Sequence, residues 1–357
     1  MKAGGVVFKL KSKFFSNEIG IDVGTTNTVI YVKSKGVVLK EPSVIAVRAL
    51  GRKGSKEIIA FGSDAKKMVG RTPIGVSTIN PLSHGVIADF EMTEHMIRHY
   101  IRSAIGGSGL FSSPRVAVCV PANVTEVEKR AVVEVTLAAG AKEAFVVEEP
   151  FAAALGIDMP VYEPQGSMVV NIGGGTCEVA VLSLGGIVLN NATRIAGKLL
   201  DDTIISMIRQ NYTVVIGDST AEEIKITIGT ALENDQELFM EVRGRDLVDG
   251  LPKVIKIGSR EVFEALDPIL TQIEDIIRST LEQTPPELVR DIVDQGIVIT
   301  GGVSQLRGLN LRLADTLNVP VHLAEHPMYS VAMGLGKILE TPVEKSKVSI
   351  VIERGKI

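Results

Sequence analysis

The chain has 357 residues, 45% of them hydrophobic, and a formal net charge of −4. This length and composition allow two domains with separate cores and exclude a disordered or fibrous protein. Acidic and basic residues are mixed along the chain, so nucleic acid is not expected as a partner. The two cysteines fit neither a disulfide framework nor a zinc cluster, and no signal-peptide pattern opens the chain, which predicts a cytoplasmic protein.

The first segment in chain order, residues 1–17, is basic and amphipathic. At helical angles its apolar side chains share one broad arc, Lys9 and Lys13 lie opposite, and Lys11 interrupts the apolar side. The segment is either a frayed terminus or docked strand, or an anchor on an anionic membrane surface. No apolar run is long enough to span a bilayer, so the expected membrane contact is peripheral, at the inner face of the cell membrane. The candidate membrane-binding residues here are Val7, Phe8, Leu10, Phe14 and Phe15.

Alternating strand-like and helical stretches follow, and they indicate an α/β fold. Strands at 115–121 and 143–150 flank a helix within 123–141. Asn123 is its expected N-cap, with Glu126 completing a capping box, and the helix is expected to close at Gly140.

Two more amphipathic helices are expected, at 91–105 and at 262–284. Pro268 should enter or kink the second helix, and Pro285 and Pro286 should stop it.

The later part of the chain carries two further features. The stretch from Asp201 to about Gly258 is rich in charged and β-branched residues, which suggests an inserted subdomain. The tail 340–357 alternates apolar and polar residues, so it is expected to be an added edge strand or a mobile extension.

Two strand–turn–strand phrases of one pattern occur in the two halves of the chain. In IGIDVGTTNTVIYV (19–32) and VVNIGGGTCEVAVL (169–182), an apolar strand enters a turn of glycine and small hydroxyl residues and returns as a second strand. Such turns leave backbone N–H groups free, and glycine lets phosphate oxygens approach them. One hairpin alone could be only a tight turn, but two in equivalent positions predict a clamp on a phosphate chain. A Walker loop or a dinucleotide fingerprint would instead open a helix.

Together with VITGGVSQLRGL (298–309) and EEPFAAALG (148–156), these hairpins resemble the actin, heat-shock chaperone and sugar-kinase ATPase superfamily. Within it, the chain is similar to the bacterial MreB family over roughly residues 18–339. The stretches that carry the similarity are EPSVIAV (41–47), MVGRTP (68–73), PLSHGVIADFEMTEHMI (81–97), VRGRDLVDGLP (242–252) and TPPELVRDIVDQGIVITGG (284–302).

The resemblance implies an actin-like ATPase fold, in which two lobes of duplicated ribonuclease-H-like domains surround a nucleotide cleft. The implied divisions are lobe I at 18–160 with a subdomain IB at about 40–80, lobe II at 161–339 with a subdomain IIB at about 199–262, and a return to lobe I near 328–339.

The resemblance also implies which residues bind ATP or ADP and Mg²⁺. Asp22 should hold Mg²⁺ through water, Glu149 should orient the attacking water, and Thr176 should help to place it, because phosphoryl transfer depends on such positioning. From the residues alone, Glu149 could instead cap a turn before Pro150. The other implied nucleotide contacts are Gly24, Thr25, Thr26 and Asn27 on the phosphates, Gly173, Gly174, Gly175 and Thr176 from the other lobe, Glu222, Glu223, Ile224 and Lys225 at ribose and adenine, and Gly301, Gly302, Val303, Ser304, Gln305 and Leu306 at the base and phosphates.

Departures from the family pattern concern the same site. Asn171, which belongs to the implied catalytic set, stands where the family has aspartate, and an amide neither attracts Mg²⁺ by charge nor accepts a proton. Slow ATP hydrolysis is therefore expected. Thr227 and Val303 replace a glutamate and a glycine, while Lys198 and Leu199 disturb a family phrase. These changes suggest a divergent paralogue with a reshaped base pocket.

A second candidate membrane contact lies in the Gly/Ser-rich loop 106–115. Leu110 and Phe111 have no obvious core to enter there, and in the family a small apolar loop of this lobe dips into the bilayer. Packing of the loop on the protein is the alternative.

Two function classes follow from these features. The first is an ATP-binding bacterial actin that assembles into paired protofilaments on anionic membrane lipid and contributes to cell shape, shape change or motility, with cell-shape or wall-synthesis proteins as further partners. The second is a small-molecule kinase of the same superfamily. A kinase would need a general-base aspartate and a sugar pocket, and only Glu149 is a candidate base.

Overall fold

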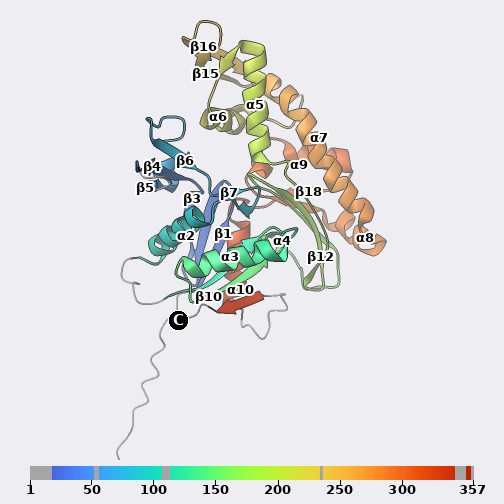
Figure 1. Cartoon of the computed structure of the whole chain (residues 1–357). Helices are drawn as coiled ribbons and strands as arrows, with labels where there is room; N and C mark the ends of the chain where they lie inside the picture. The colour runs from blue at the N-terminus through green and yellow to red at the C-terminus, as the bar shows by residue number, and fades with distance from the viewer. Residues whose placement is uncertain (1–17, 52–55, 107–112, 234–235, 342–350, 355–357) are drawn as a thin grey trace, which may run out of the picture.

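The structure is a computed structural model that describes residues 18–51, 56–106, 113–233, 236–341 and 351–354 (Figure 1). The predicted membrane-binding residues in segment 1–17, and Leu110 and Phe111, lie outside the described residues.

Two large mixed sheets form the centre of the molecule. The strands of the first are β1 (Glu18–Val23), β2 (Asn27–Val32), β3 (Gly36–Pro42), β9 (Arg115–Val120), β10 (Glu143–Glu148) and β19 (Val351–Arg354). The strands of the second are β11 (Ser167–Ile172), β12 (Cys177–Ser183), β13 (Gly186–Thr193), β17 (Ile297–Thr300) and β18 (Val321–Leu323). We call the part of the molecule built on the first sheet lobe I and the part built on the second sheet lobe II.

The two sheets have the same topology. Their strand orders are β19-β10-β9-β1-β2-β3 and β18-β17-β11-β12-β13. In each lobe a three-stranded antiparallel meander is extended by two parallel strands on the side of its first strand. The chain therefore contains one α/β unit twice, as the repeated phrases predict.

The end of the chain adds one strand to lobe I. Strand β19 pairs antiparallel with β10 at the edge of the six-stranded sheet. Of the two expectations for the tail, the edge strand is therefore confirmed for residues 351–354.

Each lobe also carries a small sheet. In lobe I these strands are β4 (Ile45–Ala49), β5 (Lys56–Phe61) and β6 (Val76–Ile79), next to helix α1 (Gly62–Lys66), with a separate hairpin of β7 (Leu82–Ser83) and β8 (Val86–Ile87). In lobe II they are β14 (Val214–Val215), β15 (Phe239–Asp246) and β16 (Pro252–Gly258), next to α5 (Gly197–Tyr212) and α6 (Asp218–Ile228). The small sheets lie on the same side of the two large sheets (Figure 1). The lobe boundaries given above remain a proposal.

The remaining helices connect and cover the large sheets. They are α2 (Phe90–Ile105), α3 (Glu126–Ala138), α4 (Glu149–Gly156), α7 (Ser259–Gln283), α8 (Pro286–Gln295), α9 (Leu309–Leu317) and α10 (Ser330–Glu340), with a short 3-10 helix η2 (Val303–Gln305).

The expected start of α3 is wrong by two residues. Its N-cap is Thr125, whose hydroxyl accepts a hydrogen bond from the Glu128 backbone N–H at 3.3 Å, while the Glu128 carboxylate accepts one from the Thr125 N–H. Asn123 does not cap the helix because its side-chain oxygen accepts a hydrogen bond from Asn190 Nδ2 at 2.6 Å. A contact with lobe II therefore overrides the local capping pattern.

Helix α7 begins at Ser259, so Pro268 lies in the interior of the helix and not in its first turn. The helix ends at Gln283, before Pro285 and Pro286, as predicted.

Helices α4 and α10 pack together between the two sheets. A Cβ added to Gly156 would lie 1.8 Å from the Ser330 carbonyl oxygen, and one added to Gly334 would lie 1.8 Å from the Ala152 carbonyl oxygen. The surrounding core contains Phe145 of the lobe I sheet together with residues of the lobe II sheet. The two lobes therefore share a tightly packed apolar junction.

Candidate nucleotide site

The two glycine-rich turns have the same backbone closure. The Gly24 N–H donates to the Asn27 carbonyl at 3.1 Å, and the Gly173 N–H donates to the Thr176 carbonyl at 2.8 Å. Each turn joins the first two strands of the antiparallel meander in its sheet, β1 to β2 and β11 to β12. The repeated sequence phrase therefore produces a repeated structure at equivalent places in the two lobes.

The two turns also contact each other. A Cβ added to Gly174 would lie 1.8 Å from Thr26 Oγ1, and a Cβ added to Gly175 would lie 2.5 Å from Thr25 Oγ1. Any larger residue at 174 or 175 would force the turns apart. Glycine is needed here because the turn of one lobe occupies the space beside the turn of the other.

Neighbouring segments support both turns. On the lobe I side, the Ser43 hydroxyl donates to the Gly24 carbonyl at 2.6 Å. On the lobe II side, the first residues of α5 donate backbone hydrogen bonds to the turn, with Gly197 N–H to the Gly173 carbonyl at 3.1 Å and Lys198 N–H to the Gly174 carbonyl at 2.8 Å. These contacts hold the carbonyl groups of the turns in fixed directions.

Two of the predicted catalytic residues, Asn171 and Glu149, are in contact next to the lobe II turn. Asn171 and Glu149 are both buried, and Asn171 Nδ2 donates to Glu149 Oε2 at 3.4 Å. Glu149 is the first residue of α4 and directly follows β10. The structure therefore brings the end of a lobe I strand into contact with the lobe II hairpin.

Burial shapes the acid–base properties of this region. It raises the pKa of Asp22 to about 7. Burial, followed by the charges of Glu178 and Asp22, raises the pKa of Glu149 well above its usual range. Among the residues that the structure describes, no basic side chain lowers the pKa of Asp22, Glu149 or Glu178, so burial favours their neutral, protonated forms.

Glu178 is a further acidic residue of the site that the sequence interpretation missed. It lies on β12 directly opposite Asn171, and it is fully buried. In lobe I, Asp22 is opposite Val29 in the same register. Each hairpin therefore carries one acid at this level, on its first strand in lobe I and on its second strand in lobe II.

The acidic residues fit a magnesium ion that is carried by a nucleotide. Mg²⁺ prefers oxygen ligands and is often held by one or two carboxylates plus phosphate oxygens and water. Among the described residues there is no group of three or more His, Cys, Asp or Glu that could hold a metal ion without such help. The Asp22 carboxylate, two residues before the lobe I turn, suits a Mg²⁺ ion whose other ligands are phosphate oxygens and water.

The residues predicted at ribose and adenine differ in their surroundings. Glu222 forms an ion pair with Lys66 of α1 at 2.7 Å, and Lys225 pairs with Asp201 at 2.7 Å. Glu223 is exposed, while the Ile224 side chain is packed in the core of lobe II. The Lys66–Glu222 pair joins the small-sheet regions of the two lobes.

The third glycine segment packs against the lobe II hairpin. A Cβ added to Gly301 would lie 2.8 Å from Asn171 Oδ1, and the Ser304 hydroxyl donates to the Gly301 carbonyl at 2.7 Å. Val303 and Leu306 enter the lobe II core, and Gly302 and Gln305 are exposed.

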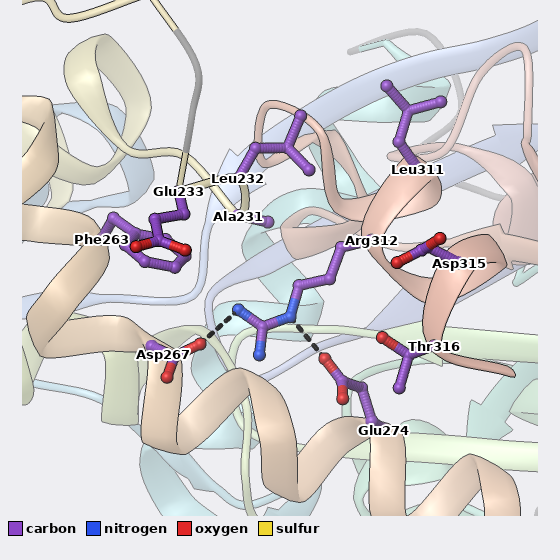
Figure 2. A pocket seen from close by; sticks show the side chains of 10 residues that line it. All are labelled: Ala231, Leu232, Glu233, Phe263, Asp267, Glu274, Leu311, Arg312, Asp315 and Thr316. Carbon is purple, nitrogen blue, oxygen red and sulfur yellow. Dashed lines mark hydrogen bonds and ion pairs between the residues drawn. The ribbon is translucent and has the colours of Figure 1, made fainter.

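A separate open pocket of about 480 Å³ lies between α7, α9 and the residues that follow α6 (Figure 2). Arg312 occupies its centre and pairs with Asp267 at 2.7 Å and with Glu274. None of the predicted site residues lines this pocket. Because Arg312 is already paired with both acids, we interpret it as a tie between α7 and α9.

The duplicated sheets and the facing glycine turns define an actin-like fold, and comparisons with known proteins agree with this class. The family model described as MreB/Mbl protein matches residues 16–347. The chain therefore belongs to the MreB/Mbl family. No helix in the described part of the chain is both long and apolar enough to cross a membrane.

Curated relatives match along nearly their whole length. The cell shape-determining protein MreB of Escherichia coli K12 is 49% identical over 326 residues, which cover 91% of this chain and 94% of that protein. The cell shape-determining protein Mbl of Bacillus subtilis 168 is 46% identical over 326 residues, covering 91% of this chain and 96% of Mbl.

Solved structures give the same fold. The crystal structure of MreB5 of Spiroplasma citri bound to AMPPNP has a TM-score of 0.86 and 36% identity, and covers 93% of this chain and 98% of MreB5. A MamK double helical filament has a TM-score of 0.77 at 21% identity, with coverage of 92% of this chain and 99% of MamK. At that identity MamK supports the fold alone.

Proposed function

We propose that this chain is an ATP-binding bacterial actin that forms membrane-associated filaments and contributes to cell shape. The observation that carries the proposal is the pair of identically closed turns, one from each lobe, in direct contact. Backbone N–H groups at such turns bind phosphate oxygens. The MreB5 structures bound to AMPPNP and to ADP, at 36% and 34% identity, support a nucleotide at this place.

The residues of the site suggest how the nucleotide is handled. Turns 24–27 and 173–176 would bind the phosphate chain from the two lobes. Asp22 would hold Mg²⁺ through water, and when bound this ion would neutralise the phosphate oxygens. Glu149 would orient the attacking water with help from Thr176. Asn171 keeps the neighbouring position neutral, which favours slow hydrolysis.

The cellular role rests on the relatives. The curated MreB and Mbl proteins are named for determining cell shape. Self-association follows if nucleotide binding favours a closed arrangement of the lobes in which subunit contacts are complementary. Segment 1–17 and the Leu110–Phe111 loop would give each subunit two weak contacts with anionic lipid, at the inner face of the membrane.

Two measurements test the proposal. Titration with a fluorescent ATP analogue, with and without Mg²⁺, should show saturable binding that unlabelled ATP displaces. Pelleting and negative-stain electron microscopy should then show filaments with ATP or AMPPNP. Absence of binding would contradict the proposed nucleotide site, and binding without filaments would contradict the proposed assembly.

The kinase alternative is not favoured, because the relatives that match are cell shape-determining proteins. ATP consumption that depends on an added sugar or other small acceptor would reverse this conclusion.

A further inference from the structure

Glu178 is the only acid among the described residues of the β11–β12 hairpin, and it lies where the two lobes meet. Its side chain is fully buried on the face of β12 that also carries Ala180 and Leu182. That face belongs to the apolar core shared with the lobe I sheet. A carboxylate at this position costs stability unless a specific contact offsets its desolvation.

One such contact crosses between the lobes. Glu178 Oε1 accepts a hydrogen bond from the backbone N–H of Ala122 at 2.8 Å. Ala122 lies just after β9, in the loop that leads to α3 of lobe I. The other oxygen, Oε2, is buried and has no hydrogen-bond partner. One carboxylate oxygen therefore contacts lobe I, and the other is buried without a hydrogen-bond partner.

The loop that Glu178 holds also packs against the phosphate turns. A Cβ added to Gly85 would lie 2.6 Å from Pro121 Cγ and 3.5 Å from Thr176 Cγ2. The Gly85 N–H donates to Thr25 Oγ1 at 2.9 Å. Residues 121–123 are therefore packed, through the β7–β8 turn, against both the lobe I turn and the lobe II turn.

A second contact between the lobes involves the same loop. Asn190 Nδ2 of β13 donates to Asn123 Oδ1 at 2.6 Å. This pair is near the surface, whereas the Glu178 contact is buried, so the Glu178 contact is the less screened of the two.

The surroundings of Glu178 are acidic. Burial raises its pKa to about 7, the Ala122 hydrogen bond acts in the opposite direction, and the charge of Glu148 adds to the rise. The Ala122 N–H therefore does not fully offset the desolvation of the carboxyl group.

We propose that Glu178 is a positioning residue that holds the Pro121–Asn123 loop of lobe I against the lobe II hairpin and so sets the separation of the two phosphate turns. This inference rests on the proposed nucleotide site. It assigns to Glu178 the coupling of nucleotide binding to closure of the lobes, with no direct part in the chemical step.

The test measures the distance between the lobes. Fluorescent labels at Ile74→Cys in lobe I and Val248→Cys in lobe II occupy exposed positions next to the two small sheets. Addition of Mg-AMPPNP should shorten the label distance in the otherwise unaltered protein. Glu178→Gln keeps an oxygen that can accept from Ala122 and should close as far, whereas Glu178→Ala should show less than half of the change.

A second variant removes the same hydrogen bond from the lobe I side. The Val124 N–H donates to the Pro121 carbonyl at 3.4 Å, so Ala122 is the second residue of a turn, a position that accepts proline. Ala122→Pro removes the donor and should reduce closure as Glu178→Ala does. It therefore tests the same hydrogen bond if Glu178→Ala folds poorly. Asn123→Ala, which removes only the near-surface contact, is the matched control and should close normally.

The outcomes separate the two proposals. Closure of Glu178→Ala and Ala122→Pro to the same distance as the parent would overturn the role of Glu178. If the parent does not bind AMPPNP, the nucleotide proposal fails, and the nucleotide-free distance distribution then decides about Glu178. It should be broader in Glu178→Ala than in Glu178→Gln, and equal distributions would overturn the role.

Discussion

At the scale of single residues, the main question is why one hairpin of the site has an acid on its first strand and the other does not. Asp22 and Asn171 occupy equivalent positions, and the register places Glu178 opposite Asn171. The lobe I acid therefore lies on the first strand of its hairpin, whereas the lobe II acid lies at the same level on the second strand. The site therefore carries one acid in each lobe, and the lobe II position equivalent to Asp22 is the neutral Asn171.

Asn171→Asp should increase phosphate release from Mg-ATP about tenfold, because a charge at this position stabilises the metal and the developing charge of the transition state. The measurement is a coupled phosphate assay on both proteins side by side. Asn211→Asp, at an exposed position on α5, is the matched control and should leave the rate unchanged. Equal rates for the parent and Asn171→Asp would mean that Glu149 and Thr176 are sufficient for hydrolysis and that a charge at position 171 does not limit it.

The buried acids also predict a pH dependence of stability. Burial raises the pKa of Glu178 to about 7 and that of Glu149 well above its usual range, so the folded protein binds protons that the unfolded chain releases near pH 4.5. Their contribution to stability is fully present below that pH and is lost as the pH rises through the raised pKa values, which for Glu178 is about 7. The unfolding temperature of the nucleotide-free protein should fall by a few degrees between pH 5 and pH 8, on the order expected for a loss of about 1–2 kcal/mol.

Calorimetry or circular dichroism at a series of pH values measures this effect. The double variant Glu149→Gln/Glu178→Gln should make the curve less steep, because an amide does not titrate, and Asp22, whose pKa burial also raises to about 7, should account for the remaining slope. Glu282→Gln, at an exposed position, should not change it. A double variant with the same pH slope as the parent would contradict the assignment.

At the scale of elements, a substitution at the contact between the two glycine turns tests whether nucleotide binding needs their close approach. Gly174→Ala places a Cβ 1.8 Å from Thr26 Oγ1 and should push the two turns apart. We expect ATP-analogue affinity to fall about tenfold, because overpacking a close contact costs roughly 1–3 kcal/mol. Gly186→Ala is the control, since an added Cβ there meets nothing within 4 Å. Equal affinities for the two variants would show that the turns do not need this close approach.

The elements that could be predicted from the sequence are those fixed by local pattern. The hairpins β1–β2 and β11–β12 follow from apolar strands on either side of a glycine turn, and α2 follows from its periodicity. The cap of α3 could not be predicted correctly, because Asn123 is engaged by Asn190 from the other lobe.

Glu178 and the tail illustrate the same limit. A single glutamate in an apolar strand reads like any solvent-facing residue until the partner sheet covers it. Strand β19 pairs with β10, about two hundred residues earlier in the chain, and nothing in a local window specifies that neighbour. Local sequence therefore predicts the two hairpins of the site but not the contacts that join the lobes.

At the scale of the whole molecule, the remaining prediction concerns the membrane. The two candidate contacts, residues 1–17 and the loop with Leu110 and Phe111, would each bind weakly. In a filament many such contacts act together, so binding should rise steeply when subunits assemble. Because the lysines would interact with anionic lipid, binding should also weaken in high salt.

Deletion of residues 1–15 combined with Leu110→Ser and Phe111→Ser should abolish co-sedimentation with liposomes that contain phosphatidylglycerol, while each change alone should weaken it. The measurement is made with and without Mg-AMPPNP, so that loss of lipid contact can be distinguished from loss of filaments. Leu184→Ser/Leu323→Ser removes two exposed apolar side chains elsewhere and should co-sediment like the parent. If the combined variant still forms filaments and still binds the liposomes, membrane association must come from another surface. If it forms filaments that no longer bind, assembly and lipid binding are separate properties of the chain, with the lipid contacts outside the nucleotide-binding core.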